Sequence, residues 1–320
     1  RFIGDAHTVV ANLLSGDVHF ADTFTINPTD GVSLEKEWAA SGQGGVLWSP
    51  TTIRMALVQW RTDYAEPRAL EGLRVRQALA HGFDVPSVIE TLNYGKGVQT
   101  PSVTIPTTAF YARIDKSVTR YGYDARQVAQ LMEQAGFSRG PDGMYADAGG
   151  TSFNVEVSSV GDDKNVQETA FFVDSLKKVG LGATQYVFPP AQTSDAMARA
   201  LRPGLSIRGG GTYNIFTSAE VAAPENRWNG ANRNGYKSAA YDRLYDLYNN
   251  TLDQTERVGY LSQMEQILTS EVPAVLLYFQ AEATAYSSTL KGPENTAAPG
   301  AGGGVLRIHE WTWGGQHPQA

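Results

Sequence analysis

The chain has 320 residues, of which 42% are hydrophobic and 18% charged, and this balance is typical of a folded globular protein. Its formal net charge of −7 argues against nucleic acid as a partner, because a phosphate backbone is bound by a basic surface. The chain contains no cysteine, so disulfides, thiolate metal sites and cysteine nucleophiles are excluded for these residues.

The first sixty residues predict one helix and two strands. Residues 6–15 place apolar side chains on one helical face, and Gly16 follows as a C-terminal cap. Alternating apolar residues predict strands over 18–24 and 51–60, and the glycine-rich stretch 42–45 between them predicts a turn. No apolar run in the chain approaches the ~20 residues of a membrane-spanning helix.

The rest of the chain alternates between helical and strand-like patterns. Asp84 and Asp124 precede two of the helices as N-caps, and Gly136 and Gly180 follow two of them. Helices are predicted over residues 74–80, 85–93, 125–135, 165–179, 194–201, 238–249 and 253–270. Strands are predicted over residues 153–157, 185–188, 274–279 and 305–313. The alternation indicates an α/β or α+β fold with a mixed sheet.

Residues 204–216 form the least regular part of the sequence and contain three consecutive glycines, Gly209 to Gly211. A phosphate-binding loop would continue into Lys-Ser/Thr or show a strict Gly-x-Gly-x-x-Gly pattern before a helix, and neither is present. We interpret the triplet as a turn, or as a place where the backbone closely approaches a bound molecule.

Established catalytic patterns are missing from the sequence. The five histidines lack the spacing of a zinc-binding HExxH helix, and there is no Gly-x-Ser-x-Gly elbow. The carboxylates Glu220, Glu225, Asp242 and Asp246 are interpreted as surface groups rather than an acid–base pair. We therefore expect no enzyme activity, no metal site and no cofactor. Aromatic residues in irregular segments instead favour a site that holds a polar ligand by stacking and hydrogen bonds.

Several segments, in order along the chain, resemble blocks of one known family. The clearest are LRVRQALAHGFDVPSVIETLNYGKGVQT at 73–100, PSVTIP at 101–106 and YGYDARQVAQLMEQAGF at 121–137. The stretch LLSGDV at 13–18 and the residues of 241–275 agree with them. Together these segments resemble the family 5 extracellular solute-binding proteins, which are the peptide- and nickel-type binding proteins of ABC importers.

The resemblance implies an α/β fold of the periplasmic-binding-protein type, a hinged two-lobe clamp that is type II and cluster C-like. Members of the family are about half again as long, so the chain is expected to be a C-terminal fragment or a processed product, with lobe 2 complete and lobe 1 incomplete. Residues 1–60 would be a remnant of lobe 1, residues 61–276 lobe 2, and residues 277–320 the return strand and C-terminal part of lobe 1. Strands near 56–60 and 275–279 would cross the hinge.

The resemblance also implies a function. The protein would bind a small polar solute, such as an oligopeptide or a peptide-like molecule, in the cleft between its lobes. It would then deliver the solute to the transmembrane permease of an ABC importer, which recognises the closed clamp. We expect a monomer that is periplasmic or extracellular, with a lipid anchor carried by an N-terminal segment outside this chain.

The sequence departs from the family where peptide members recognise their ligand. There, a Gly-Trp-x-Ala-Asp block supplies the aspartate that pairs with the ligand's ammonium group, and the matching residues here are 206–214. They contain neither Trp nor Asp, and Arg208 is their charged residue, so an anionic, sugar-like or modified ligand is favoured. The candidate ligand-binding residues are Trp48, Arg54, Gln59, Arg208, Tyr213, Asn214, Trp228, Tyr278 and Gln280.

Two other hypotheses stay open at this point. A carbohydrate-active hydrolase would need paired carboxylates beside an aromatic cleft, and residues 204–216 contain no carboxylate. A peptide chaperone or a sensor module would use the same fold without a transporter, and neighbouring permease and ATPase genes would separate that hypothesis from import.

Overall fold

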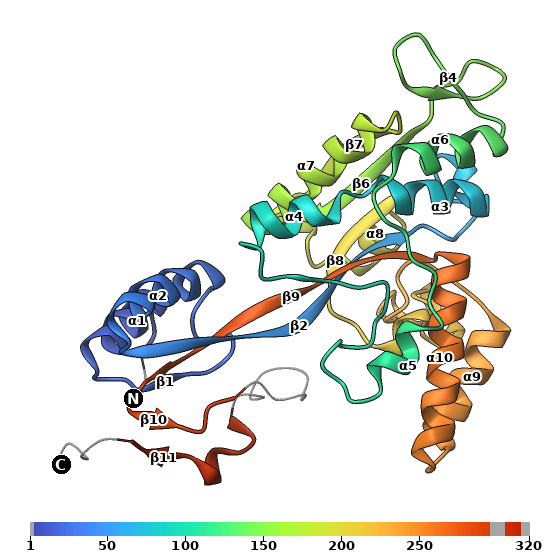
Figure 1. The fold of residues 1–320 in the computed structure, drawn as a ribbon. Helices are drawn as coiled ribbons and strands as arrows, with labels where there is room; N and C mark the ends of the chain where they lie inside the picture. Colours follow the sequence, from blue (N-terminus) through green and yellow to red (C-terminus); the bar gives the residue numbers. More distant parts are fainter. Residues whose placement is uncertain (1–2, 295–304, 315–320) are drawn as a thin grey trace.

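The computed structural model describes residues 3–294 and 305–314, and one long mixed sheet organises them (Figure 1). Its strands are β1 (Phe20–Ala21), β2 (Gly44–Val58), β3 (Val98–Gln99), β6 (Asn154–Val160), β7 (Gly182–Phe188), β8 (Leu205–Gly209) and β9 (Ala274–Ser287). They follow the order β1-β9-β2-β8-β6-β7, with β3 also paired to β9. β6 runs parallel to β7 and β8, whereas β2 is antiparallel to β8 and β9. Two short ribbons join β4 (Ser138–Arg139) to β5 (Tyr145–Ala146) and β10 (Leu290–Lys291) to β11 (Thr312–Trp313).

The helices begin and end largely where their capping residues predict. Asp84 accepts a hydrogen bond from the backbone N–H of Ser87 at 3.2 Å, and Gly136 and Gly180 adopt φ of 88° and 90°. The α-helices are α1 (Ala6–Ser15), α2 (Pro28–Ser41), α3 (Leu73–Gly82), α4 (Val85–Leu92), α5 (Tyr111–Asp115), α6 (Ala125–Gln134), α7 (Asp163–Lys178), α8 (Ala196–Ala200), α9 (Ala239–Asn250) and α10 (Gln254–Glu271). Among the described residues, none of these helices has the length and apolar character to cross a membrane.

Strands β2 and β9 are the longest in the sheet and connect two parts of the molecule. They pair antiparallel from Gly44 opposite Ser287 to Leu57 opposite Ala274. One end lies in a small unit with α1 and α2, and the other end lies in a larger body with the remaining helices (Figure 1). Fifteen residues of extended strand span about 50 Å, so β2 alone can run through both parts.

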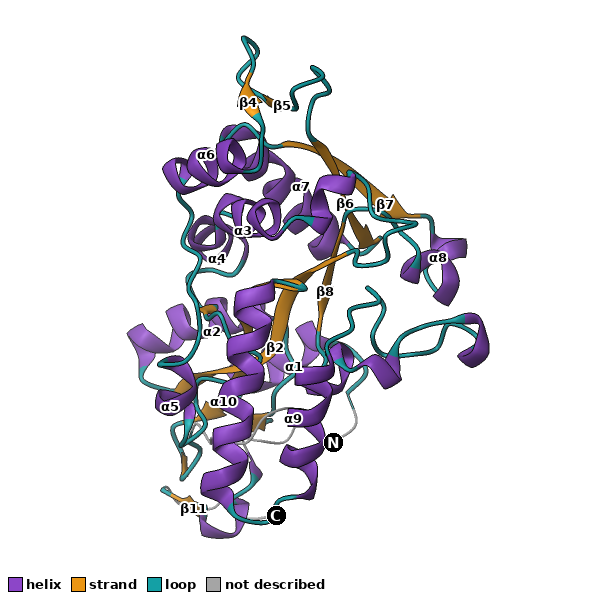
Figure 2. Cartoon of the chain, turned by 90° about the vertical axis from the view of Figure 1, so that its right-hand side faces the viewer, coloured by secondary structure: helices purple, strands orange, loops and turns teal. Residues whose placement is uncertain are grey.

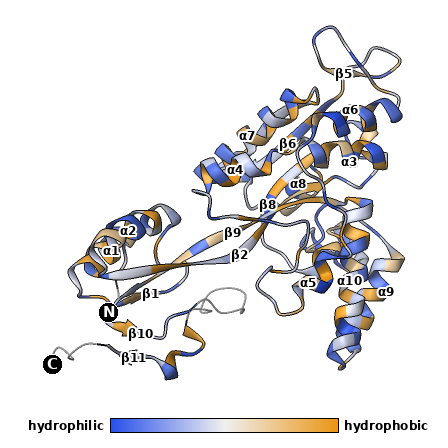
Figure 3. Cartoon of the chain, in the orientation of Figure 1, coloured by the Kyte–Doolittle hydropathy of each residue, from blue (hydrophilic) through white to orange (hydrophobic). Residues whose placement is uncertain are grey.

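The larger body has a core on each face of the sheet. Along β2, Ala56 and Val58 pack into the core shared with α3, α4, α6 and α7, while Ile53, Met55 and Leu57 pack into the core shared with α9 and α10. The alternation follows from the two-residue period of a strand. Figure 2 shows α9 and α10 side by side below the sheet, with α3, α6 and α7 above it. Figure 3 shows hydrophobic residues along β8 and hydrophilic residues on α6.

The small N-terminal unit has a separate and smaller core. Val9 and Leu13 of α1 and Leu34 and Trp38 of α2 pack against Ala283 and its neighbours on β9. The unit is therefore held to the sheet by the outer halves of the two long strands.

Several expectations about individual elements are wrong. A helix over 28–41 went unpredicted, although Asn27 caps it and Pro28 occupies its first turn. The irregular stretch 204–216 contains β8, an interior strand of the sheet. Strand β8 has only five residues, and its apolar Leu205 and Ile207 alternate with the polar Ser206 and Arg208. Because Gly210 and Gly211 follow directly, this short alternation is hard to recognise in the sequence. Gly44 and Gly45 belong to β2 rather than to a turn.

The strand predicted over 305–313 is also wrong. That segment forms a short 3₁₀ turn at Ile308–Glu310, and only Thr312 and Trp313 pair with β10. The predicted strand 18–24 shortens to Phe20–Ala21, because two residues are all that reach β9 at the edge of the sheet.

Candidate functional site

A pocket rich in arginine lies beside β8, with a volume of about 250 Å³. Strand β8 contributes Ser206, Ile207 and Arg208, and the side chains of Ser206 and Arg208 lie on the face opposite to Ile207. The end of β2, the short helix α8 and the loop before α9 form further walls, and Val160, Asn165 and Phe188 line it from the ends of β6, α7 and β7. The residues that line it include Gln59, Arg199, Ser206, Arg208 and Arg233.

Arg208 is an unsatisfied cationic group at this pocket. Among the described residues, its buried Nη1 atom has no hydrogen-bond partner, and neither does the buried Oδ1 atom of Asn234, which also lines the pocket. Burial lowers the pKa of Arg208 to about 10, and the positive charges of Arg233 and Arg199 act in the same direction. A guanidinium with a pKa of about 10 still carries its full charge at neutral pH. Within the described part of the chain, no carboxylate forms an ion pair with any of these three arginines.

A fourth arginine at the pocket is neutralised. Arg202 donates from Nε to Oε1 of Glu156 at 2.8 Å, and its guanidinium lies 3.6 Å from the ring centroid of Tyr186. Gln59 fixes the neighbouring backbone, because its Nε2 donates to the carbonyl oxygens of Ala200 at 3.0 Å and Arg202 at 2.8 Å. One wall of the pocket is therefore held rigid and electrically balanced, and the unbalanced charge belongs to Arg199, Arg208 and Arg233.

Arg54 and Tyr278 lie in a different place, a buried network between the sheet and α7. Arg54 donates from Nε to Glu168 at 3.1 and 3.2 Å, and the hydroxyl of Tyr278 donates to Glu168 Oε1 at 2.7 Å. Asn93 donates to the Tyr278 hydroxyl at 3.1 Å, and Asn165, which also borders the arginine pocket, accepts from Arg54. Burial works against the charge of Arg54, but Glu168 outweighs it and the net pKa of Arg54 is raised. Their side chains are committed to each other rather than to the arginine pocket.

Tyr213 lies at a second cavity of about 550 Å³, lined by aromatic and aliphatic side chains together with several threonines. Its hydroxyl bonds Thr104 and donates to Glu265 Oε1 at 3.2 Å. Glu265 is fully buried and also accepts from Ser102 at 2.7 Å, so this group anchors the loop 100–104 to α10. Burial raises the pKa of Glu265. It also raises the pKa of Tyr213, well above the usual range of a tyrosine.

The remaining predicted residues are dispersed. Trp48 packs in the small unit, where its indole N–H donates to Glu35 at 3.4 Å. Asn214 accepts from Thr212 Oγ1 at 2.6 Å and borders a separate small hollow. Trp228 is half-buried in a loop with φ of 62°. Gln280 bonds its strand neighbour Glu282. Of the nine predicted residues, the structure brings Gln59 and Arg208 together in the arginine pocket.

The sequence model of the bacterial extracellular solute-binding proteins, family 5 (Middle), matches residues 1–225. The chain belongs to this family. No curated protein matches it. The match extends over both the small unit and most of the larger body, which agrees with the resemblance carried by residues 73–137.

Solved structures of family 5 proteins share the fold of this chain. NikZ from Campylobacter jejuni, in complex with Ni(L-His), superposes with a TM-score of 0.68 at 20% identity over 98% of this chain. The oligopeptide-binding protein from Thermus thermophilus, complexed with a pentapeptide, gives 0.69 at 20% identity over 95%. NikA from Brucella suis, in complex with Fe(III)-EDTA, gives 0.71 at 17% identity over 97%. These similarities confirm the periplasmic-binding-protein fold. The chain spans 61%, 54% and 60% of the lengths of those three proteins.

Arg199 and Arg233 are pocket residues of this family 5 chain that the sequence did not reveal. Arg199 lies on α8 and Arg233 lies in the loop before α9, far from Arg208 in sequence. A spacing pattern identifies side chains on one helix or strand, and these three arginines come from three separate segments. Only the packing of α8 and that loop against β8 brings them together.

Proposed function

We propose that this protein captures a small polar solute and delivers it to an ABC importer. Membership of family 5 supports this function, and the path of β2 and β9 through two parts of the molecule fits a hinged clamp. No covalent chemistry is required of such a clamp. The partner would be the transmembrane subunits of the permease, and the protein would work as a monomer in the periplasm or outside the cell.

The division into lobes is part of the proposal. Residues 1–60 and 277–320 would belong to lobe 1 and residues 61–276 to lobe 2. The separate core of α1 and α2 supports the first assignment, and the two large cores of the body support the second. Parts of the two assigned lobes meet where Lys96 binds Glu35, with Nζ 2.7 Å from Oε2.

The solute is proposed to carry an acidic group, and the unpaired guanidinium of Arg208 is the observation that carries this assignment. A buried cation without a counter-ion is unfavourable, and a negatively charged ligand removes that cost. The ammonium group of a free peptide N-terminus would instead be repelled by Arg199, Arg208 and Arg233. The ligand would therefore be a modified or acidic peptide-like molecule, or a sugar-like acid.

Native mass spectrometry of the protein, purified without denaturation, tests this function. We expect a co-purified small molecule bearing at least one acidic group, lost when the protein is unfolded and dialysed. Isothermal titration of the stripped protein with the identified molecule should restore one-to-one binding. A co-purified peptide with a free amino terminus and no acidic group would contradict the acidic assignment.

The alternative functions predict different results. A carbohydrate-active hydrolase would need two carboxylates at the site, and the residues that line the arginine pocket include none. Turnover of the bound molecule by the purified protein would favour the enzyme. Binding without any effect on uptake when the protein is deleted from cells would favour a chaperone or sensor.

A further inference from the structure

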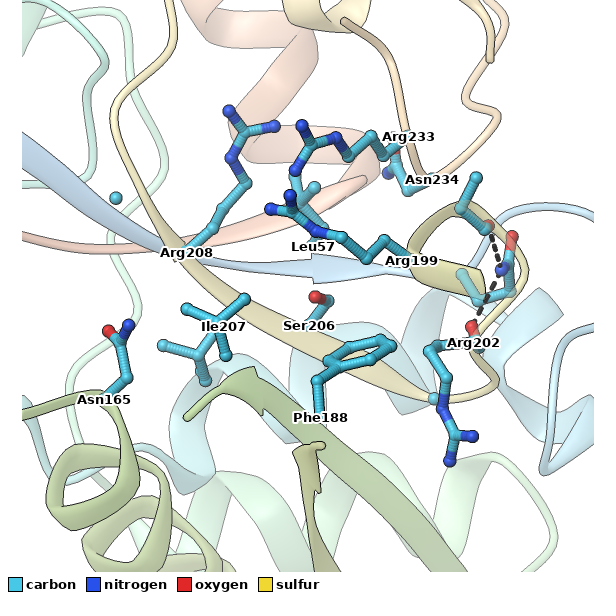
Figure 4. A pocket seen from close by; sticks show the side chains of 15 residues that line it. Leu57, Asn165, Phe188, Arg199, Arg202, Ser206, Ile207, Arg208, Arg233 and Asn234 are labelled. Carbon is cyan, nitrogen blue, oxygen red and sulfur yellow. Dashed lines mark hydrogen bonds between the residues drawn. The ribbon is translucent and has the colours of Figure 1, made fainter. Parts of the chain in front are cut away.

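Three arginines from three elements direct their charged ends to one place. Figure 4 shows the guanidinium groups of Arg199, Arg208 and Arg233 gathered on one side of β8. The three charges also interact electrostatically. Arg233 and Arg199 both lower the pKa of Arg208, and Arg199 lowers the pKa of Arg233. Like charges placed together in a half-buried pocket repel one another, so the arrangement is unfavourable when empty.

The charge of the pocket exceeds what a single carboxylate can balance. Arg199, Arg208 and Arg233 contribute three positive charges, whereas Arg202 is already paired with Glu156. A monocarboxylate would leave two of the three charges uncompensated. Two negative charges in a compact group would bring the pocket close to balance.

We propose that the arginine pocket binds a phosphoryl group, either as inorganic phosphate or as the phosphomonoester of a larger solute. This inference rests on the proposed function only in taking that group to be part of the transported solute. Guanidinium groups present paired N–H donors that match phosphate oxygens, and three of them approaching from different elements match the three or four oxygens of a tetrahedral anion. A dicarboxylate separates its two charges, which suits a longer site than one of about 250 Å³ centred on one arginine cluster.

Other residues of the pocket are compatible with an oxyanion. The hydroxyl of Ser206 lies on the same face of β8 as Arg208 and can donate a further hydrogen bond. Among the described residues, none of those that line the pocket is acidic, so none repels an anion there. The rigid wall made by Gln59 keeps α8, and with it Arg199, in position.

Calorimetric titration of the stripped protein at low ionic strength tests the proposal. The probes are inorganic phosphate, glycerol phosphate, acetate and succinate. We expect measurable binding of one or both phosphoryl compounds and at least tenfold weaker binding of acetate and succinate. Inorganic phosphate alone would identify the free anion as the solute, and tighter binding of glycerol phosphate would identify an ester.

Substitutions of the pocket arginines provide a second test of phosphoryl binding. Arg208→Met and Arg233→Met should each weaken phosphoryl binding by roughly 10- to 100-fold, as expected for loss of a charge-assisted hydrogen bond. Arg126→Met, on the exposed face of α6, should leave binding unchanged. Circular dichroism confirms that each variant is folded. Arg199→Gln, which removes the pocket charge on α8, is used in place of any variant that does not fold. Unchanged affinity in folded pocket variants would overturn the proposal.

The pH dependence separates a phosphoryl group from a carboxylate. A phosphomonoester dianion takes up a proton near a pKa of about 6, whereas a carboxylate takes up its proton near about 4. Affinity should therefore fall between pH 7.5 and pH 5 if a dianion is bound. Affinity that stays constant over this range, or preferred binding of the carboxylates, would overturn the phosphoryl assignment while leaving solute capture intact. Failure to bind or co-purify any small molecule would count against the proposed function itself.

Discussion

Two arginines on neighbouring strands show how partners decide what a buried charge does. Arg54 of β2 lies in register with Gly209, next to Arg208 on β8. Arg54 is buried beside Glu168 and further polar groups, and it holds α7 against the sheet. Arg208 is half-buried with a nitrogen that has no partner. The first arginine is structural, and the second is available to a ligand.

At the scale of the residue, we predict that Arg208 lowers the stability of the folded protein when no ligand is bound. Arg208→Met removes a desolvated charge and its repulsion from Arg199 and Arg233 while keeping the apolar stem. The melting temperature without ligand should rise by about 1–2 °C, which corresponds to roughly 1 kcal/mol for a chain of this size.

Differential scanning calorimetry in a buffer without phosphate or sulfate measures this shift. Arg208→Lys keeps the charge and serves as the control, which should not gain stability. A melting temperature that falls in Arg208→Met would show that the arginine stabilises the fold, contrary to this prediction.

At the scale of the element, the buried network joins α7 to both long strands. Glu168 accepts from Arg54 on β2 and from Tyr278 on β9, so one carboxylate ties three elements together. The pair is almost fully buried, with side-chain exposures of 7% for Arg54 and 1% for Glu168. Removing one partner of such a pair leaves the other charge buried without compensation.

We therefore predict that Glu168→Gln lowers the free energy of unfolding by about 3 kcal/mol. The double variant Arg54→Met/Glu168→Met should recover part of this loss, because it removes both charges. Urea unfolding followed by circular dichroism measures both. Asp174→Asn breaks an exposed pair with Lys178 and should change stability by less than about 0.5 kcal/mol. An effect of Glu168→Gln as small as that of Asp174→Asn would show that the network contributes little.

At the scale of the whole molecule, the two parts joined by β2 and β9 also meet at a second place. Lys96, in the turn between α4 and β3, binds Glu35 of α2 at 2.7 Å and lies 5.0 Å from the ring centroid of Trp48. Thr29 and Tyr94 share a hydrogen bond at 2.9 Å beside it. These polar contacts are partly exposed, so they restrain the small unit weakly compared with the strands.

Lys96→Met should loosen the small unit without unfolding the body. The methionine keeps the contact with Trp48 and removes the ion pair, which is worth less than about 1 kcal/mol. Amide hydrogen exchange in α1 and α2 should therefore speed up roughly twofold to fivefold, with α3 and α7 unchanged. Lys177→Met, which removes an exposed charge from α7, is the control. Equal exchange in α1 and α2 of both variants would mean that the Lys96 contact does not restrain the unit.

Local patterns in the sequence were sufficient to predict many helices and strands and to recognise the family. A cap such as Asp84 acts on an N–H three residues away, and Gly136 relieves the strain of its own φ, so both signals are contained in a few residues. The fold class follows from the alternation of such elements, and the segment 73–137 carries the similarity to family 5 that the model of that family bears out.

The tertiary structure alone decided which polar residues have internal partners and which line the arginine pocket. Arg54 and Glu168 are 114 residues apart, so no local pattern could show that this predicted binding residue has an internal partner. Arg199, Arg208 and Arg233 likewise meet only because α8 and a loop pack against β8. The sequence by itself determined that residues 206–214 contain no acid and that Arg208 is their charged residue. Packing determined that its charge is unpaired, because pairing depends on distances between segments that the order of residues does not contain.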